Sequence, residues 1–243
     1  MAKAKYHGKL TFEERETEFI EYIRSRDENS AERKDGREVQ EFYDHNAQDY
    51  EKFLQNVGSV SYIYGAREFA KRLKGKRLPT DVKIADFGAG TGRVGQELKE
   101  QHGYTNIVAM DISPGMLDEA KKKDAYNDFI VSDLNEDNME KYYKQFDHAI
   151  SIACFVLGNL LPDTLDKIAR IVKSGGLVCI SFRKQTIESE EIGYKQKLEE
   201  METKGVWKEI SRALDYYQQF VPTREGTKTV RAYYIVFQSS AIL

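Results

Sequence analysis

The sequence predicts an α/β fold built on a doubly wound sheet of seven strands, mostly parallel and ending in an antiparallel hairpin. From residue 82 to residue 183, five short apolar segments alternate with helix-like segments. This alternation is typical of a parallel sheet with helices on both faces. Beyond residue 183 the rhythm changes, because two runs of aromatic and β-branched residues flank the glycine-containing turn TREGTK, 223–228. Such a pair favours a closing hairpin.

The individual elements follow from apolar periodicity and from residues that begin or end helices. The expected strands cover residues 82–88, 106–111, 128–134, 147–157, 177–183, 207–222 and 230–240. The expected helices cover residues 11–23, 39–54, 62–75, 91–103, 113–123, 162–176 and 186–205. Ser113 and Pro114 illustrate a helix start, with a capping hydroxyl followed by proline in the first turn.

The composition excludes several classes of protein. The chain has 243 residues with 37 basic and 40 acidic side chains, a net charge of -3, which argues against a dedicated nucleic-acid binder. No apolar run approaches the length of a membrane span, and the first residues lack the apolar segment of a secretory signal. Cys154 and Cys179 lie in apolar runs, so we expect reduced thiols in a cytoplasmic protein and no metal site.

The segment IADFGAGTGRVG, residues 84–95, places a glycine-rich turn directly after the first expected strand. Gly90 to Gly95 match the G-x-G-x-x-G pattern of dinucleotide-binding proteins, which by itself is weak evidence. Asp86 stands before the turn at the carboxyl end of the strand, where its charge would repel a pyrophosphate. The sequence therefore disfavours NAD and favours a ligand with a positive group at this point.

S-adenosylmethionine has such groups, an ammonium and a sulfonium, and carries no phosphate. Asp86, Gly88, Gly90 and Gly92 form the pattern D-x-G-x-G-x-G, in which the glycines allow the backbone to approach a ligand closely. Two further acids end the next two strands. We expect Asp111 to accept the ribose hydroxyls, by analogy with dinucleotide sites, and Asp133 to accept the adenine amino group, with Leu134 covering the ring.

These motifs resemble the core of the class I S-adenosylmethionine-dependent methyltransferases, a Rossmann-like fold, and most closely the small methyltransferase-like proteins of the Williams–Beuren-region type. The segment FYDHNAQDYEKFL is similar to the Y-D-x-x-A-x-x-Y segment of that group. The resemblance implies that N-terminal helices cover the cofactor and that tyrosine hydroxyls reach its methionine end. The expected cofactor-binding residues are Tyr43, Tyr50, Asp86, Gly88, Ala89, Gly90, Asp111, Ile112, Met116, Ser132, Asp133, Leu134 and Ala153.

The expected organisation is one methyltransferase domain, residues 37–243, preceded by a charged and loosely held extension, residues 1–36. Within the domain we expect a helical lid (37–80), a cofactor-binding core (81–183) and a helix with the closing hairpin (184–243). The extension is dense in charge and poor in core-forming side chains.

The expected reaction is methyl transfer to a small-molecule acceptor, which leaves S-adenosylhomocysteine. The chain lacks the N/D-P-P-Y/W motif after the fourth strand, which lowers the weight of amino-group methylation on DNA bases or glutamine. Two alternatives stay open: a non-catalytic cofactor-binding module that acts through a protein partner, and a protein or RNA methyltransferase. The oligomeric state is not readable from the sequence.

The acceptor pocket is expected near the end of the fourth strand. Cys154, Phe155 and Asn159 would surround it, and an aromatic wall would come from Tyr62, Tyr64, Tyr216, Tyr217 and Phe220. Methyl transfer from a sulfonium depends mainly on alignment, so a catalytic base is not required. His45 and His148 are candidates for one, and no catalytic residue is assigned.

Overall fold

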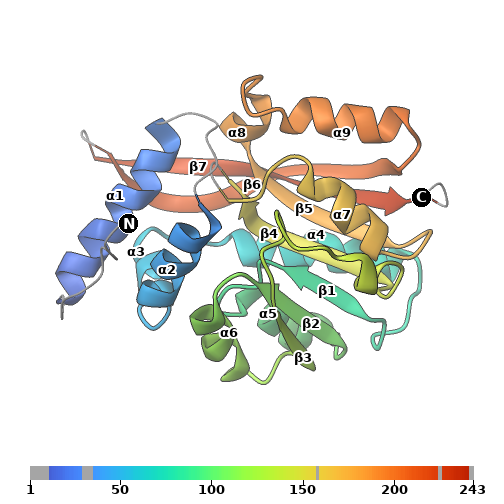
Figure 1. Cartoon of the computed structure of the whole chain (residues 1–243), viewed down its shortest axis with the longest axis horizontal. Coiled ribbons are helices and arrows are strands. Elements are labelled where there is room, and N and C mark those ends of the chain that lie inside the picture. The colour runs from blue at the N-terminus through green and yellow to red at the C-terminus, as the bar shows by residue number, and fades with distance from the viewer. Residues whose placement is uncertain (1–10, 29–34, 157–158, 224–225, 241–243) are drawn as a thin grey trace.

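The protein forms one seven-stranded sheet, seen here in a computed structural model that describes residues 11–28, 35–156, 159–223 and 226–240. The strand order is β3-β2-β1-β4-β5-β7-β6. The first five strands are parallel, and β7 pairs antiparallel with both β5 and β6 (Figure 1). The predicted fold class is thereby confirmed.

The strands lie close to their expected positions. They are β1 (Ile84–Phe87), β2 (Ile107–Asp111), β3 (Asp128–Val131), β4 (His148–Phe155), β5 (Leu177–Arg183), β6 (Trp207–Thr223) and β7 (Gly226–Ser239). The helices are α1 (Phe12–Glu28), α2 (Gly36–Asn46), α3 (Tyr50–Asn56), α4 (Ser61–Gly75), α5 (Arg93–His102), α6 (Pro114–Lys121), α7 (Thr164–Ile171), α8 (Lys184–Glu188) and α9 (Tyr194–Thr203), with a short 3-10 turn at Glu140–Tyr142.

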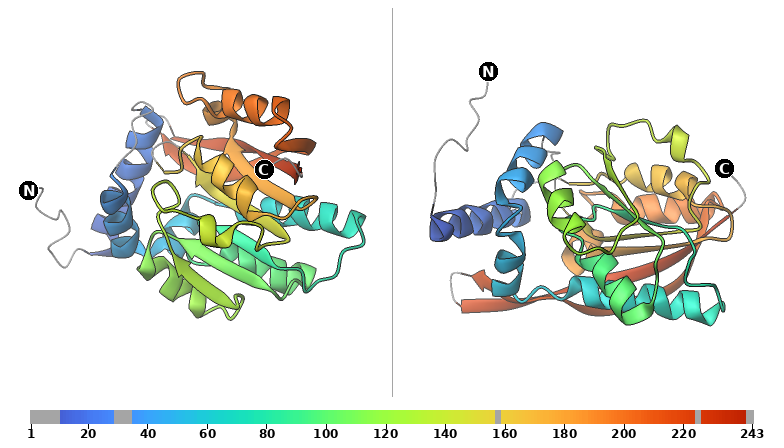
Figure 2. Two further views of the ribbon diagram at one scale, coloured as in Figure 1. Left: turned by 45° about the vertical axis from the view of Figure 1, so that its right-hand side comes forward. Right: turned by 90° about the horizontal axis from the view of Figure 1, so that it is seen from below.

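Helices cover both faces of the sheet (Figure 2). Neighbouring residues of a strand point to opposite faces, so Ala149 and Ile150 of β4 belong to two different apolar clusters. The cluster of Ala149 contains side chains of α7 and α9, and the cluster of Ile150 contains side chains of α4 and α5. Burial on both faces explains the nearly continuous apolar runs of the parallel strands.

The N-terminal helices α1, α2 and α3 form a small apolar cluster beside the sheet, which we call the lid. Phe19 of α1, Phe42 of α2 and Phe53 of α3 are its buried members. The ring centroids of Phe19 and Phe53 are 5.0 Å apart, and Arg15 pairs with Asp49 at 2.5 Å. Phe19 thus supplies an apolar anchor within the charged segment that was expected to be a loosely held extension.

Two expectations differ from the structure. The expected lid runs to residue 80, whereas α4 lies in the helical layer of the sheet, with Phe69 and Leu73 fully buried there. The single helix expected over 186–205 is two helices, because Gly193 adopts a left-handed conformation with φ of 82° and begins α9. The domain boundaries themselves stay a prediction.

The closing hairpin also supports the lid. Beside α3, the backbone N–H of Val60 donates to the carbonyl of Tyr217 in β6 at 3.1 Å, and Ser59 pairs with Gln218. Gly58 has φ of 60°, and a Cβ there would lie 2.6 Å from the ring of Phe220. The long β6 therefore fixes the connection between α3 and α4. Within the described residues, no helix combines the length and apolar character needed to cross a membrane.

Candidate functional site

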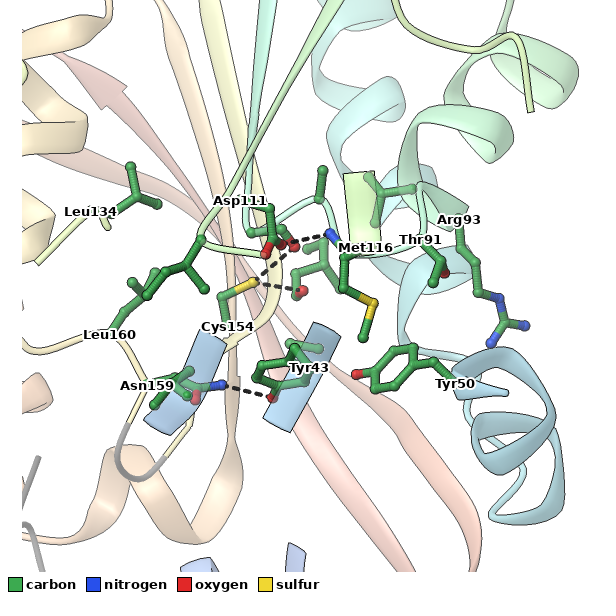
Figure 3. A pocket seen from close by; sticks show the side chains of 18 of the residues that line it. Tyr43, Tyr50, Thr91, Arg93, Asp111, Met116, Leu134, Cys154, Asn159 and Leu160 are labelled. Carbon is green, nitrogen blue, oxygen red and sulfur yellow. Dashed lines mark hydrogen bonds between the residues drawn. The ribbon is translucent and has the colours of Figure 1, made fainter. Parts of the chain in front are cut away.

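A pocket that is open to solvent lies between the lid and the ends of β1, β2, β3 and β4 (Figure 3). All the residues predicted to hold the cofactor line it, apart from Asp86. The carboxyl ends of parallel strands are the usual place for a ligand in an open α/β sheet. Further lining comes from Gly36, Val39, Leu54, Ser59, Ser61, Tyr62, Thr91, Arg93, Val94, Asn135, Ile152, Cys154, Asn159 and Leu160.

The first half of the glycine turn forms the floor of the pocket. Gly88 and Gly90 have φ values of 67° and 55°. A Cβ on Gly88 would lie 2.2 Å from the sulfur of Cys154, whereas a Cβ on Gly90 would meet no atom within 4 Å. Because Gly90 lines the pocket, that open space is room for a ligand against bare backbone.

The second half of the turn is explained by packing. A Cβ on Gly95 would lie 2.3 Å from the ring of Tyr126, and one on Gly92 would lie 2.9 Å from it. The Tyr126 hydroxyl accepts from the N–H of Gly95 at 3.0 Å and donates to Asp86 at 2.7 Å. The later glycines of the G-x-G-x-x-G pattern thus make room for Tyr126 and, at Gly92, also for Ala120.

Asp86 is buried in β1 and does not line the pocket. Alternation along β1 turns it away from the face of Ala85 and Phe87, and its Oδ2 receives the Tyr126 hydroxyl. Its Oδ1 is buried and has no hydrogen-bond partner among the described residues. Burial raises the pKa of Asp86 to about 7, the nearby Asp111 adds to this, and the Tyr126 hydrogen bond opposes it. Asp86 is thus the one expected cofactor-binding residue that does not line the pocket, and its role stays a prediction.

Asp111 lies at the end of β2, on the pocket surface. Its Oδ2 accepts from the N–H of Gly90 at 2.8 Å, and its Oδ1 accepts from the N–H of Ser113 at 2.9 Å. Burial raises the pKa of Asp111 to about 6, although these backbone hydrogen bonds oppose the rise. Each carboxylate oxygen has further lone-pair capacity for a ligand hydroxyl. The ribose role of Asp111 fits this geometry and stays a prediction.

Ser132, Asp133 and Leu134 follow β3 and form another wall of the pocket. Asp133 accepts from the N–H of Asn135 at 3.0 Å, which shapes the turn after the strand. Ser132 donates its hydroxyl to Asp137 at 2.7 Å, and Leu134 is almost fully buried. An apolar side chain beside a carboxylate suits a heteroaromatic ring with an amino group, as expected for adenine.

Ala153 is a non-glycine residue with φ of 67°, inside β4. The register of β4 with β5 shifts between Ser151 and Phe155, as in a β-bulge, and Ala153 donates its N–H to the hydroxyl of Ser181 at 2.8 Å. Left-handed backbone is uncommon for alanine, and such strain is concentrated at functional sites. The bulge presents Ala153 and Cys154 to the pocket together.

The lid closes the pocket opposite the sheet. Asn159 donates to the hydroxyl of Tyr43 at 3.2 Å, and Figure 3 shows this pair across the pocket from Asp111, with Cys154 between them. The rings of Tyr43 and Tyr50 meet edge to face, with centroids 5.9 Å apart. Burial raises the pKa of Tyr50 well above its usual range, so its hydroxyl stays protonated and can donate.

The lid is fastened to the core by Asp44. Its Oδ1 accepts from the hydroxyl of Ser113 at 2.5 Å and from the N–H of Gly115 at 2.8 Å. Both donors belong to the start of α6, where a carboxylate is stabilised by the exposed N–H groups and the helix dipole. A Cβ on Gly115 would lie 3.0 Å from Asp44, so the close approach of α2 depends on this glycine.

Part of the expected acceptor site is found elsewhere. Cys154, Asn159 and Tyr62 line the pocket, but Phe155 is buried against Phe182 and Tyr194. The remaining members of the expected aromatic wall do not line it: Tyr64, Tyr216, Tyr217 and Phe220. They pack on or beside the hairpin, whose alternation places aromatic residues on both of its faces.

Neither of the two candidate bases, His45 and His148, lines the pocket. His148 begins β4, at the end of the strand away from the pocket, and its Nδ1 accepts from the N–H of Leu177 at 2.9 Å. Burial lowers the pKa of His148 to about 4, so it is a neutral structural acceptor.

Sequence reasoning missed several lining residues. Arg93 directly follows the glycine turn, and its position at the start of α5 could have indicated it. Ser59 and Ser61 are placed by the long-range pairing with β6, which has no local sequence signal. Asn135 accepts from the N–H of Leu161 at 2.8 Å and from the hydroxyl of Thr164, so it ties the loop after β3 to the loop after β4.

Comparisons with known proteins agree with this geometry. A family model described as a methyltransferase domain matches residues 84–176. Human methyltransferase-like protein 27 is 28% identical over 173 residues, which cover 68% of this chain and 66% of that protein. A malonyl-[acyl-carrier protein] O-methyltransferase of Priestia megaterium is 31% identical over 139 residues, which cover 55% of this chain and 50% of that enzyme. The chain thus matches half to two thirds of the length of these relatives.

A solved structure supports the fold assignment. The magnesium protoporphyrin IX methyltransferase of Synechocystis PCC 6803, with bound S-adenosylhomocysteine, superposes with a TM-score of 0.59 and 15% identity over 85% of this chain and 100% of that chain. At this identity the likeness shows a shared fold. The region matched by the family model, residues 84–176, contains the glycine turn and the acids after β2 and β3, so this part of the chain is similar to a methyltransferase domain, and the chain as a whole resembles the small methyltransferase-like proteins.

Proposed function

We propose that this chain transfers a methyl group from S-adenosylmethionine to a small-molecule acceptor in the cytoplasm. The observation that carries the proposal is the two-sided pocket, with the glycine turn and Asp111 on one side and Tyr43 with Asn159 on the other. The sheet side offers backbone and carboxylates to the cofactor. The lid side offers hydroxyl and amide groups that can orient a second molecule.

The cofactor supplies a methyl group that is already activated on a sulfonium. The residues of this chain therefore have to hold the two molecules in line and exclude water, and such orientation can contribute about 7–11 kcal/mol. Closing the lid over the pocket would serve both purposes. Tyr43 and Asn159 are the polar groups best placed to align the acceptor, since their hydrogen bond joins α2 to the loop after β4 beside the pocket.

The acceptor is expected to arrive with its nucleophilic atom already available. The described lining contains no histidine or lysine, and Asp111 already accepts two backbone N–H groups. Burial raises the pKa of the Cys154 thiol, whose sulfur lies 3.3 Å from the carbonyl oxygens of Phe87 and Gly88. A carboxylate, thiolate or neutral amine would need no base from the protein. The relative from Priestia is named an O-methyltransferase of malonyl-acyl carrier protein, which is compatible with a carboxylate acceptor.

Labelled cofactor tests the proposal. The full chain is incubated with S-adenosylmethionine labelled in the methyl group and with a cell extract separated into small-molecule and macromolecular fractions. We expect label to appear in the small-molecule fraction, at a rate lowered by Asn159→Ala. Label confined to protein or RNA would overturn the small-molecule assignment. Tight cofactor binding without transfer to either fraction would instead support a non-catalytic binding module.

A further inference from the structure

Arg93 is the only basic side chain among the described residues that line the pocket. It is the first residue of α5, directly after the glycine turn. Its guanidinium carbon lies 3.8 Å from the centre of the Tyr62 ring, a cation–π contact that holds the group in place. Its Nη1 is buried and has no hydrogen-bond partner among the described residues. A buried guanidinium nitrogen without a partner is costly unless a ligand completes it.

The charges around the pocket indicate which group of a ligand Arg93 would bind. Two carboxylates, Asp111 and Asp133, line the pocket together with the single guanidinium of Arg93. Asp111 and Asp133 are expected to accept from the ribose hydroxyls and from the adenine amino group, and neither carboxylate can pair with the α-carboxylate of S-adenosylmethionine, which leaves that group for Arg93. In Figure 3, Leu134 and Arg93 lie at opposite sides of the pocket, with Asp111 between them. Adenine at Leu134 and ribose at Asp111 would extend the methionine toward Arg93.

We propose, resting on the proposed use of S-adenosylmethionine, that Arg93 is the carboxylate-binding residue of this pocket and that the α-carboxylate of the cofactor is the group it holds. A guanidinium can meet a carboxylate with two parallel N–H donors, which gives geometric precision as well as attraction. Tyr62 orients the guanidinium from behind, and the hydroxyls of Ser59 and Ser61 lie on the same pocket. A carboxylate on the acceptor is the other source of the same chemistry.

Calorimetry with two ligands tests the proposal without any turnover. The first ligand is S-adenosylhomocysteine, and the second is its analogue with hydrogen in place of the α-carboxylate. For the wild-type chain we expect the analogue to bind about 10- to 100-fold more weakly, as for a lost charge-assisted hydrogen bond. For Arg93→Gln we expect both ligands to bind equally within about threefold, at the weakened level. Arg93→Lys should recover part of the difference between the two ligands, because lysine keeps the charge but lacks the two parallel N–H donors of the guanidinium.

Arg67→Gln is a matched control. Arg67 also lies over a tyrosine, 4.4 Å from the Tyr64 ring centre, but it is paired with Asp215 at 2.8 Å and lies outside the pocket. We expect this variant to bind both ligands as the wild type does. Thermal melting of each ligand-free variant shows whether the fold is intact, and the comparison between ligands is independent of any general destabilisation.

A second arm distinguishes the source of the carboxylate. Acetate, malonate and benzoate are titrated into wild-type and Arg93→Gln protein that is saturated with S-adenosylhomocysteine. Suppose that the affinity difference between S-adenosylhomocysteine and its analogue is the same in the wild type and in Arg93→Gln, but that one of these anions binds only to the wild type. Arg93 then holds a carboxylate of the acceptor. If neither the cofactor carboxylate nor these anions depend on Arg93, the proposal is wrong. In that case, retained cofactor binding and turnover would leave the proposed methyl transfer intact.

Discussion

Asp111 connects two ligand-facing backbone segments, because one carboxylate accepts from the glycine turn at Gly90 and from the start of α6 at Ser113. Asp44 of α2 accepts from the hydroxyl of the same serine, and this hydrogen bond joins the lid to the start of α6. The pocket floor, the first turn of α6 and the lid therefore meet at one hydrogen-bonded group. A ligand that bonds to Asp111 would stabilise all three segments together.

Changing Asp111 to Asn should weaken S-adenosylhomocysteine binding. The amide keeps the shape of the side chain but places N–H donors against the N–H of Gly90 or Ser113, and it lacks the charge that attracts ribose hydroxyls. We expect a loss of about 1–3 kcal/mol, measured by calorimetry. Removing the 2′-hydroxyl of the ligand should then cost little further affinity in this variant. Asp128→Asn, on the exposed start of β3, is the control, and wild-type affinity in a folded Asp111→Asn chain would contradict the ribose role.

Asp86 predicts a pH dependence of stability in the ligand-free chain. Its folded pKa of about 7 lies above the ordinary value of 3.8, so between these values the folded chain keeps a proton that the unfolded chain releases. Stability should therefore fall as the pH rises from about 4 to about 7, then stay at the lower level. Asp86→Asn removes this loss. Its melting temperature should exceed that of the wild type by more at pH 8 than at pH 5, with each kcal/mol worth about 2–4 °C. An equal difference at both pH values would contradict the assignment.

At the level of the elements, the lid is a separate small cluster with few buried apolar residues. Phe19, Phe42 and Phe53 are its buried members, whereas the clusters on the sheet are much larger. Segments with little buried apolar surface open at a lower free energy than the sheet. The lid is held to the core by Asp44, by the hydrogen bond between Tyr43 and Asn159, by the ion pair of Glu51 with Lys123 and by the hairpin contact at Val60. It is therefore the element that can open to exchange cofactor and product.

Phe19→Ala should loosen the lid while leaving the sheet intact. Phe19 is 1% exposed and stacks on the rings of Phe42 and Phe53, and Phe-to-Ala changes in apolar clusters cost about 3–5 kcal/mol. We expect hydrogen exchange to speed up in α2 and α3 and to stay unchanged in β4 and β5. Affinity for S-adenosylhomocysteine should fall, since binding must then order the lid. Glu13→Ala on the exposed side of α1 serves as the control, and unchanged exchange in α2 would show that α1 does not support the lid.

For the whole molecule, the sheet and part of the pocket could be predicted from the sequence. Asp111 and Asp133 directly follow apolar runs, and the ends of parallel strands meet at one edge of a sheet. The side of the strand on which Asp86 lies could not be predicted from spacing, because it depends on Tyr126 filling the space above Gly95. The packing of α1 and the place of Ser59 depend on contacts between segments far apart in the chain. Such contacts are set by tertiary packing and have no local pattern.

The ligand preference of the whole chain can be tested by thermal stability. A ligand that binds only the folded state stabilises it by about 2.7 kcal/mol at one hundred times its dissociation constant. For S-adenosylhomocysteine we therefore expect the melting temperature to rise by about 5–11 °C under those conditions. NAD at the same concentration should change it by less than about 1 °C. Two carboxylates line the pocket, no lysine does so among the described residues, and Gly92, the glycine that would face a pyrophosphate, is packed against Ala120 and Tyr126. A larger shift with NAD than with S-adenosylhomocysteine would mean that the glycine turn serves a dinucleotide after all.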